Sequence, residues 1–440
     1  MPTISKETWM PPVTSDIPIQ KNERGNWIER YDRIRQRTLA IAKPLTSEDA
    51  MVQSMSDVSP PKWHLAHTTW FFETFILAGR KGFTLHNPQW QMLFNSYYEQ
   101  AGPYFPRSRR GLLSRPSLQQ VLDYRTRTDH RIIEWLRQDC PPPDDPLLDI
   151  LELGLNHEEQ HQELMLTDIL HIFSCNPLDP VYQPTSTPHH QAPALTWKLF
   201  ESQIAKIGHN GHGFSFDQES PAHSFYIQSF QLANRPATCG DYLEFIEDGG
   251  YNNPTLWLSE GWHQQQSANW QGPMYWRQTE HEGWQQMTLS GLLPLDTQAP
   301  VAYVSFYEAD AFARWRGCRL PGEQEWELAA MTTGTGDHNM FEQGRLRPSA
   351  ACPTANHHAP LLQLYGDVWE WTGSAYRPYP GYWPSAGAIG EYNGKFMCNQ
   401  MVLRGGSCLT PEEHIRPTYR NFFPPHARWQ CMGLRLARDS

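Results

Sequence analysis

The sequence predicts a protein of two domains, an N-terminal four-helix bundle followed by a mixed α+β domain. At 440 residues the chain is longer than one hydrophobic core usually serves. Apolar residues recur at spacings of three and four from residue 22 to about 173, as on the buried faces of helices. A Pro-rich stretch then marks a linker, and short strand-like pieces with Gly-, Pro- and Trp-rich loops follow. The expected divisions are an N-terminal extension at 1–21, the bundle at 22–174, the linker at 175–196 and the second domain at 197–440.

The individual elements follow from local patterns. Prolines before the second and fourth periodic segments provide helix starts, because the ring of proline fixes a helical φ and lacks the N–H that a first turn leaves free. The long connection at 83–114 exceeds a simple bundle loop and is a candidate functional segment. We expect bundle helices at 28–42, 63–77, 118–135 and 147–173, later helices at 307–315 and 323–331, and strands at 225–232 and 401–405.

Charge and composition exclude several classes of function. The formal net charge of -11 argues against nucleic-acid or anionic-membrane partners. No run approaches the roughly 20 apolar residues of a membrane span, and no apolar signal segment precedes residue 24. The eight cysteines form no C-x-x-C pair, so we expect reduced thiols and a cytoplasmic protein. Whether the chain forms homo-oligomers is left open by the sequence.

The segment around His157 and His161 predicts a metal site. Side chains four residues apart share one face of a helix, so both imidazoles can reach one cation. A third ligand is expected from a second apolar helix, where periodicity cannot choose between His64 and His67. Glu158 and Glu159 fall on other faces of the helix and are expected to be solvated or to lie behind the ligands.

Space beside the metal-binding face is expected at Gly154, one turn before His157. Three neutral imidazoles would leave open coordination positions and suit non-haem Fe(II), although Zn²⁺ would also accept them.

Sequence blocks in both halves resemble known families. The second half contains VSFYEA at 304–309, RLPGEQEWE at 319–327, GDVWEWT at 366–372 and LRGGS at 403–407. These blocks resemble the formylglycine-generating-enzyme (sulfatase-modifying-factor) domain, a C-type-lectin-like fold. The first half resembles a DinB-type four-helix bundle through the histidine motifs. Joined in one chain, the two halves resemble the EgtB-type sulfoxide synthases of ergothioneine biosynthesis, the hercynine oxygenases, over nearly the whole length.

The resemblance implies a reaction and a set of site residues. The reaction couples Nα-trimethylhistidine (hercynine) with cysteine or a cysteine-containing peptide and O2, at Fe(II), to give a sulfoxide. His67 is implied as the third ligand beside His157 and His161. The implied contacts to hercynine are Gln160 and Asn421, with the aromatic faces of Phe422 and Phe423 as candidates for the trimethylammonium group. Arg107 and Arg110, in the long connection, match the arginines that bind the thiol substrate.

The sequence departs from the mycobacterial-type pattern at two positions. That pattern has a tyrosine three residues before another tyrosine, where this chain has Ile389 before Tyr392. We expect the pair Tyr97 and Tyr98 to supply the proton donor instead, with Tyr98 favoured. The pattern's aspartate that reads a γ-glutamyl amine is replaced by Phe423. Free cysteine is therefore the expected thiol substrate.

Three alternative functions compete with this interpretation. A formylglycine-generating oxidase needs paired cysteines, and Cys408 has no cysteine partner nearby in the sequence. An ovothiol-type 5-histidylcysteine sulfoxide synthase usually carries a methyltransferase domain, and no G-x-G-x-x-G stretch is present. A non-catalytic binding module is the third, since lectin-like domains often only bind. The histidine trio argues against it.

Overall fold

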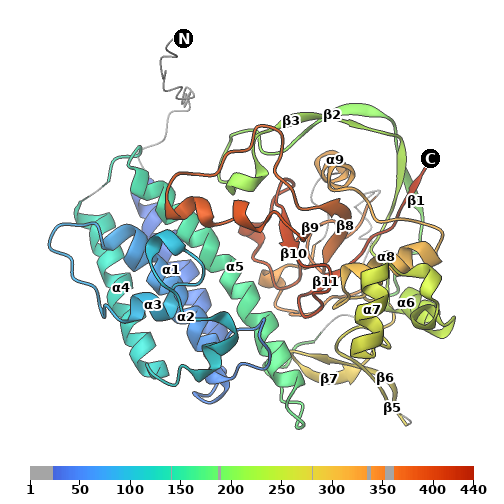
Figure 1. Ribbon diagram of the computed structural model, residues 1–440, viewed down its shortest axis with the longest axis horizontal. Helices are drawn as coiled ribbons and strands as arrows, with labels where there is room; N and C mark the ends of the chain where they lie inside the picture. The colour runs from blue at the N-terminus through green and yellow to red at the C-terminus, as the bar shows by residue number, and fades with distance from the viewer. Residues whose placement is uncertain (1–22, 140, 187–189, 280, 334–337, 352–360) are drawn as a thin grey trace, which may run out of the picture.

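The computed structural model describes residues 23–139, 141–186, 190–279, 281–333, 338–351 and 361–440. Helices make up the first half, and strands together with further helices make up the second (Figure 1). The predicted extension at 1–21 and part of the predicted linker, 187–189, lie outside the described residues. No helix of the described part is long and apolar enough to cross a membrane.

The N-terminal half is the predicted four-helix bundle. Its helices are α1 (Glu23–Ala42), α2 (Pro61–Phe72), continued by a π-helical turn (Glu73–Leu77), α4 (Leu118–Gln138) and α5 (Pro146–Ser174). Pro61 and Pro146 occupy the first helical positions of α2 and α5, as predicted. The long connection between α2 and α4 holds α3 (Trp90–Phe94) and a 3-10 turn (Arg107–Leu112). The predicted bundle is confirmed.

The second half combines small sheets and helices. Its helices are α6 (Cys239–Glu247), α7 (Ser259–Ala268), α8 (Phe306–Trp315) and α9 (Glu323–Thr333). Its strands are β1 (Trp197–Phe200), β2 (Gln203–Ile207), β3 (His223–Ile227), β4 (Phe230–Ala233), β5 (Trp276–Thr279), β6 (Gly283–Thr288), β7 (Gly291–Pro294), β8 (Trp369–Ala375), β9 (Met401–Arg404), β10 (Asn421–Phe423), β11 (Met432–Gly433) and β12 (Ala437–Asp439). The predicted mixed α+β architecture is confirmed.

Strand order among the described residues is β10-β9-β8-β11 in one sheet and β1-β4-β12, β5-β6-β7 and β2-β3 in the others. The single strand expected at 225–232 is wrong, because the chain there divides into β3 and β4, which belong to different sheets. The hydrophobic pattern was continuous, but the chain changes sheets between Ile227 and Phe230.

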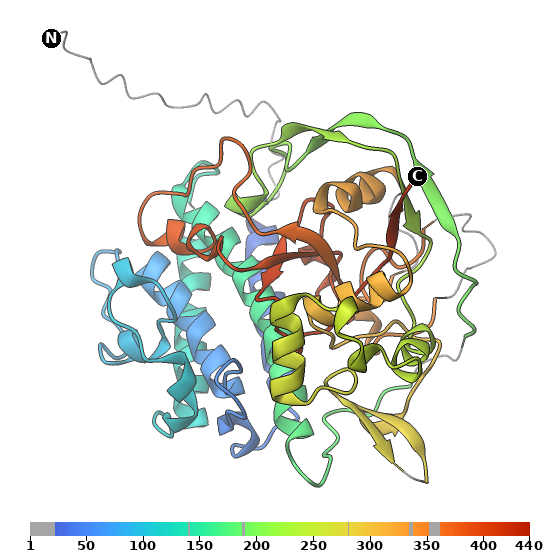
Figure 2. The same ribbon diagram turned by 45° about the vertical axis from the view of Figure 1, so that its right-hand side comes forward.

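Helix α5 joins the two halves. In Figures 1 and 2 it lies between the other bundle helices and the strands of the second half. Glu163 on this helix is buried and accepts hydrogen bonds from Trp369 Nε1 (2.8 Å), Ser407 Oγ (2.6 Å) and Thr410 Oγ1 (2.7 Å) of the second half. The same helix carries His157 and His161, so residues of both halves meet at one face. The boundaries at 174 and 197 stay a prediction.

Candidate metal centre

Three buried imidazoles converge between α2 and α5. One ring nitrogen from each of His67, His157 and His161 lies within 4.8 Å of the other two. The Nε2 atoms of His67 and His157 are 3.2 Å apart. All three side chains are buried. The structure thus brings together the three residues that the sequence analysis selected as ligands.

The orientation of His67 follows from its contact with the long connection. Its Nδ1 lies 2.6 Å from the carbonyl oxygen of Phe94, which can only accept a hydrogen bond. Nδ1 therefore carries the proton, and the lone pair of Nε2 faces the other two histidines. Trp63 stacks on the His67 ring, with centroids 4.5 Å apart and planes at 13°. Trp63 thus packs on the face of the His67 ring, and the Phe94 carbonyl fixes its Nδ1 edge.

His64 acts behind the ligands. Its Nδ1 lies 2.8 Å from His161 Nδ1, and its Nε2 lies 3.0 Å from Asp168 Oδ2. Asp168 Oδ2 also accepts a hydrogen bond from the backbone N–H of Ser59 (2.8 Å). Asp168 thus orients His64, and His64 orients His161. This arrangement leaves His161 Nε2 free to bind a metal. The choice that periodicity left open between His64 and His67 thus has a geometric answer.

The electrostatics favour neutral rings at this centre. Burial lowers the pKa of His157 to about 3, and burial with neighbouring histidines lowers the pKa of His67 and His161 well below the usual value. His157 Nδ1 is buried and has no hydrogen-bond partner among the described residues. Neutral imidazoles with converging lone pairs fit a divalent metal ion that accepts nitrogen ligands, such as Fe(II) or Zn²⁺.

The two glutamates between the ligands are not solvated. Glu158 is fully buried and pairs with Arg35 Nη1 (2.7 Å) and with Arg125. Glu159 is also fully buried and lies 3.2 Å from Arg37 Nη1. The expectation of solvated carboxylates was wrong because α1 and α4 supply arginines to the faces of α5 that point away from the histidines.

The space expected at Gly154 is filled by aromatic rings. A Cβ atom on this residue would lie 2.6 Å from a ring atom of Phe72 and 2.8 Å from one of Phe71. Phe71 also packs against the His157 ring, at 4.9 Å between centroids. The glycine therefore allows α2 and α5 to pack closely beside the trio and opens no cavity there.

Three tyrosines approach this centre. Tyr98 is fully buried, its hydroxyl has no hydrogen-bond partner among the described residues, and its ring stacks on Tyr97 at 4.7 Å. Burial raises the pKa of Tyr98 well above its usual value, and the hydroxyls of Tyr97 and Tyr392 raise it further. Tyr392 packs edge-on against His157, at 5.6 Å. Phe71 contacts both Tyr98 and His157, so one aromatic ring separates the Tyr98 ring from this imidazole.

The two predicted arginines have different surroundings. Arg110 is buried, with its guanidinium carbon 3.3 Å from the centroid of the Trp63 ring, and it donates a hydrogen bond to Ser59 Oγ (2.9 Å). No carboxylate lies within ion-pair distance of it among the described residues, although Asp168 acts on it from further away, and burial together with Arg107 lowers its pKa well below the usual value. Arg107 is exposed and donates to the Asp57 carbonyl. A buried guanidinium without a counter-ion, on the tryptophan that covers His67, is suited to an anionic group.

The predicted hercynine contacts lie on the second half's side of the centre. Gln160 donates from Nε2 to Tyr419 Oη (2.6 Å) and accepts a hydrogen bond from Tyr392. Phe422 stacks on Tyr376, at 4.1 Å and 8°, so one of its faces is already covered. Phe423 packs edge-on against Trp429 at 5.8 Å. Among the described residues, Asn421 forms no hydrogen bond with the three histidines, and its Oδ1 accepts a hydrogen bond from the N–H of Phe422.

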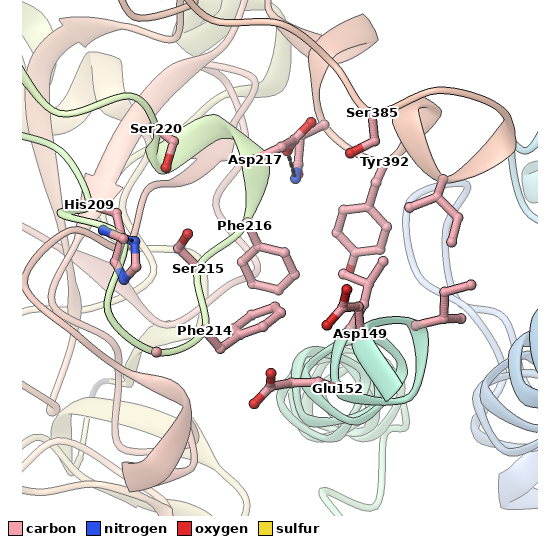
Figure 3. Close-up of a pocket in the computed structure, with 16 residues that line it drawn as sticks. Asp149, Glu152, His209, Phe214, Ser215, Phe216, Asp217, Ser220, Ser385 and Tyr392 are labelled. Atoms are coloured by element: carbon pink, nitrogen blue, oxygen red, sulfur yellow. Dashed lines mark hydrogen bonds between the residues drawn. The ribbon is translucent and has the colours of Figure 1, made fainter. Parts of the chain in front are cut away.

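A pocket of about 460 Å³ opens beside Tyr392, at the border of the two halves. Its lining includes Asp149 and Glu152 of α5, which lie below the rings of Phe216 and Tyr392 in Figure 3. Asp217 adds a third carboxylate, and no Lys or Arg is among the lining residues. The three histidines do not line it. Tyr392 connects the two places, because its ring contacts both Phe216 and His157.

Cys408 has a cysteine neighbour in the fold, although none stands close to it in the sequence. Cys431 lies 23 positions later, and the two sulfur atoms are 3.9 Å apart in the buried core. Both residues are free thiols. Sequence distance concealed this neighbour, as it concealed Tyr419 and His414 beside Gln160. None of these positions carried a motif that the sequence alone could have marked.

Comparisons with known proteins agree with the geometry. Residues 201–440 match the family model of the sulfatase-modifying factor enzyme 1-like domain, and residues 30–165 match the DinB superfamily. Over 433 residues the chain is 31% identical to a hercynine oxygenase of Mycolicibacterium smegmatis, covering 92% of this chain and 96% of the relative. A hercynine oxygenase of Mycobacterium tuberculosis is 30% identical, with 92% and 97% covered.

A third relative matches a shorter stretch. Ergothioneine biosynthesis protein 1 of Schizosaccharomyces pombe is 27% identical over 240 residues, which is 51% of this chain and 28% of that protein. The fusion of a DinB-like bundle with a formylglycine-generating-enzyme-like domain, predicted from the motifs, is confirmed. With two relatives at or above 30% identity over nearly its full length, the chain belongs to the hercynine oxygenase family.

Proposed function

We propose that this protein is an Fe(II)-dependent sulfoxide synthase that couples hercynine with cysteine and O2 to give hercynylcysteine sulfoxide in ergothioneine biosynthesis. The observation that carries the proposal is the buried trio His67, His157 and His161, with the unpaired guanidinium of Arg110 beside it. Family membership supports the reaction class. Fe(II), when bound by the trio, would supply the redox chemistry by which O2 reacts with the thiol and the imidazole.

The electrons of this reaction balance without an external reductant. Forming the C–S bond at the imidazole carbon replaces a C–H and an S–H bond and releases two electrons. Oxidising the sulfur to the sulfoxide releases two more. O2 accepts all four, with one oxygen atom going to the sulfoxide and the other to water. The protein therefore needs substrate sites and a proton donor, but no reductase partner.

Arg110 is the proposed anchor for the cysteine carboxylate. Among the described residues no carboxylate forms an ion pair with its buried guanidinium, so a substrate carboxylate would supply a direct counter-charge. Arg107, one 3-10 turn earlier, is placed to add a second contact from the exposed side. Trp63 contacts both the Arg110 guanidinium and the His67 ring, so a carboxylate bound at Arg110 would lie about one aromatic ring away from this ligand.

Hercynine is proposed to reach the centre through the acidic pocket beside Tyr392. A trimethylammonium group donates no hydrogen bond, so carboxylates and aromatic rings are its suitable surroundings. The pocket offers Asp149 and the Phe216 ring, while Glu152 on its lining already pairs with Arg30 at 2.8 Å. Gln160, with Asn421, is proposed to contact the betaine, and Phe422 and Phe423 complete the aromatic surroundings.

Tyr98 is the proposed proton donor that directs oxidation toward C–S coupling. Its hydroxyl is buried and unpartnered among the described residues, and its raised pKa keeps it protonated. We expect Tyr98→Phe to divert thiol oxidation toward cysteine sulfinate, with a fall in sulfoxide formation of about 10²-fold or more. Mass spectrometry of the products checks this, with Tyr97→Phe as the matched control. An unchanged product ratio in Tyr98→Phe would remove the role.

The decisive experiment offers the iron-loaded protein both candidate thiols. Protein loaded with Fe(II) under nitrogen is mixed with hercynine, O2 and either cysteine or γ-glutamylcysteine, and products are identified by mass spectrometry. We expect hercynylcysteine sulfoxide, and a higher kcat/KM for cysteine because Phe423 replaces the aspartate that would bind a γ-glutamyl amine. Absence of any sulfoxide with either thiol contradicts the function. A higher kcat/KM for γ-glutamylcysteine contradicts only the choice of thiol.

A further inference from the structure

A chain of buried hydrogen bonds connects the metal-binding helix with the second half of the molecule. It runs from Asn156 on α5 to His414, then to Tyr419, back to Gln160 on α5, and ends at Tyr392. The first three distances are 3.2 Å from Asn156 Oδ1 to His414 Nδ1, 3.0 Å from His414 Nε2 to Tyr419 Oη, and 2.6 Å from Tyr419 Oη to Gln160 Nε2. The fourth bond joins Tyr392 Oη to Gln160 Oε1. Asn156, His414 and Tyr419 are each at most 2% exposed.

The direction of every bond in this chain is determined. Asn156 donates through Nδ2 to the carbonyl of Glu152 (2.9 Å), so its Oδ1 is the atom that faces His414. Glu159 Oε2 also faces His414 Nδ1, at 3.6 Å. The amide oxygen of Asn156 can only accept, so His414 Nδ1 carries the proton and Nε2 of the neutral ring is an acceptor. Burial and Glu413 raise the pKa of Glu159, so its carboxyl does not set this direction. Burial and Arg416 lower the pKa of His414 well below its usual value, which agrees with a neutral ring.

The remaining bonds follow from the tautomer of His414. Tyr419 must donate its proton to His414 Nε2, so its oxygen accepts from Gln160 Nε2. The amide of Gln160 is thereby fixed with Oε1 toward Tyr392, and Tyr392 must donate to it. The hydroxyl proton of Tyr392 is therefore committed to Gln160, although its ring contacts His157.

We infer that Tyr419 and His414 are positioning residues that fix the amide of Gln160, and through it the hydroxyl of Tyr392, at the hercynine side of the centre. The inference rests on the proposed function for the identity of the substrate, but the hydrogen-bond direction does not. Both residues come from the loop before β10, so the contact of the second half with α5 sets the orientation of a side chain between two metal-binding histidines. The same direction commits the Tyr392 proton to Gln160, which favours the pair Tyr97 and Tyr98 as the source of the proton donor.

The tautomer of His414 is tested without turnover. In metal-free protein labelled with ¹⁵N-histidine, the imidazole signals that disappear in His414→Gln belong to His414. We expect these signals to show a neutral ring protonated at Nδ1. A ring protonated at Nε2 would reverse the direction of the chain and overturn the inference, whatever the protein catalyses.

The positioning role is tested by the variant Tyr419→Phe, which leaves Gln160 Nε2 without its acceptor. We expect the Kd for hercynine, measured by calorimetry on Fe(II)-loaded protein under nitrogen, and the KM for hercynine to rise about tenfold, while the KM for cysteine stays unchanged. The matched control is Tyr182→Phe, which removes another buried tyrosine hydroxyl, bonded to the carbonyl of Ile41 at 2.7 Å. Equal effects on both substrates, or the same effect in Tyr182→Phe, would show that Tyr419 only stabilises the fold.

The commitment of the Tyr392 proton is tested by Tyr392→Phe. We expect a rise of a few-fold in the KM for hercynine and an unchanged ratio of sulfoxide to sulfinate. Diversion to sulfinate in this variant would overturn that part of the inference. If wild-type protein forms no sulfoxide at all, the proposed function fails, and the ¹⁵N experiment still decides the direction of the chain.

Discussion

Glu158 and His157 are adjacent on α5 and buried to a similar extent, but they differ in the partners that surround their polar atoms. Glu158 is fully buried and receives Arg35, Arg125 and Thr38 Oγ1, the last at 2.6 Å. His157 is 2% exposed, and its Nδ1 has no partner among the described residues. The face that carries Glu158 is satisfied within the protein. The face that carries His157 is left with unmet polar groups.

This difference distinguishes a side chain that is buried for stability from one that is buried to bind a ligand. An ionised carboxylate in the interior must be paired, because removing it from water costs several kcal/mol. A neutral imidazole can be buried at lower cost, and an unsatisfied nitrogen costs only about 1–3 kcal/mol. A metal ion and substrates can offset that cost when they bind. Burial by itself therefore does not identify a site, whereas burial without partners does.

The largest expected effect that tests this comparison is loss of the metal in His161→Ala. Removing a ligand should lower the affinity for Fe(II) by at least about 100-fold, since loss of a residue that only supports a ligand already costs 10–100-fold. Activity should be abolished while the metal-free protein stays folded. Iron content and circular dichroism check both. His171→Ala, on the same helix and outside the trio, should keep its iron; full occupancy in His161→Ala would dismiss the site.

A loss of stability is expected instead on the face of α5 that carries Glu158. Glu158→Gln leaves Arg35 and Arg125 without their shared counter-ion and should lower the free energy of unfolding by about 3–5 kcal/mol. Urea unfolding of the metal-free protein measures this. A loss below about 1 kcal/mol would mean that the pairs are not structural, and the comparison would fail.

The same residue predicts an acid-sensitive part of the stability. Burial alone would raise the pKa of Glu158, but Arg125 and Arg35 lower it from 4.5 to about 2. A carboxyl with a lowered folded-state pKa contributes stability above pH 4.5, and this contribution is lost as the pH falls from 4.5 to 2. The difference in unfolding free energy between wild type and Glu158→Gln should therefore shrink over that range.

A smaller effect is expected from His64, which supports His161. His64→Gln should weaken the affinity for Fe(II) by 10–100-fold and leave the fold intact, because His161 loses the partner that orients its ring. Competition with a chelator of known affinity measures the change. An unchanged affinity would mean that His64 only fills space between the helices.

The smallest effect is expected at a partly exposed ion pair between α1 and α5. Arg30 and Glu152 form an ion pair at 2.8 Å with 21% and 30% of their side chains exposed. Arg30→Ala should change the unfolding free energy by less than about 1 kcal/mol, since water screens the pair. Thermal unfolding checks it. A loss as large as that of Glu158→Gln would contradict the contrast between exposed and buried pairs on α5.

Much of the bundle could be predicted because its signals are local. The spacing of apolar residues and the prolines at Pro61 and Pro146 depend only on neighbouring residues, and the observed helices agree. The pairing of His157 with His161 is of the same kind, because one helical turn separates them. The small strands were less predictable, since the division between β3 and β4 depends on which sheet each strand joins.

What the sequence by itself determined was the set of helices, two histidines on one face, and family motifs that named a third. Only the tertiary structure decided that His64 supports His161, that Glu158 and Glu159 are buried against arginines, and that Cys431 lies beside Cys408. It also brought His414 to Asn156 across 258 positions. The physical reason is that a helical turn is set by nearest neighbours, whereas the partner of a buried polar group is set by how distant segments pack.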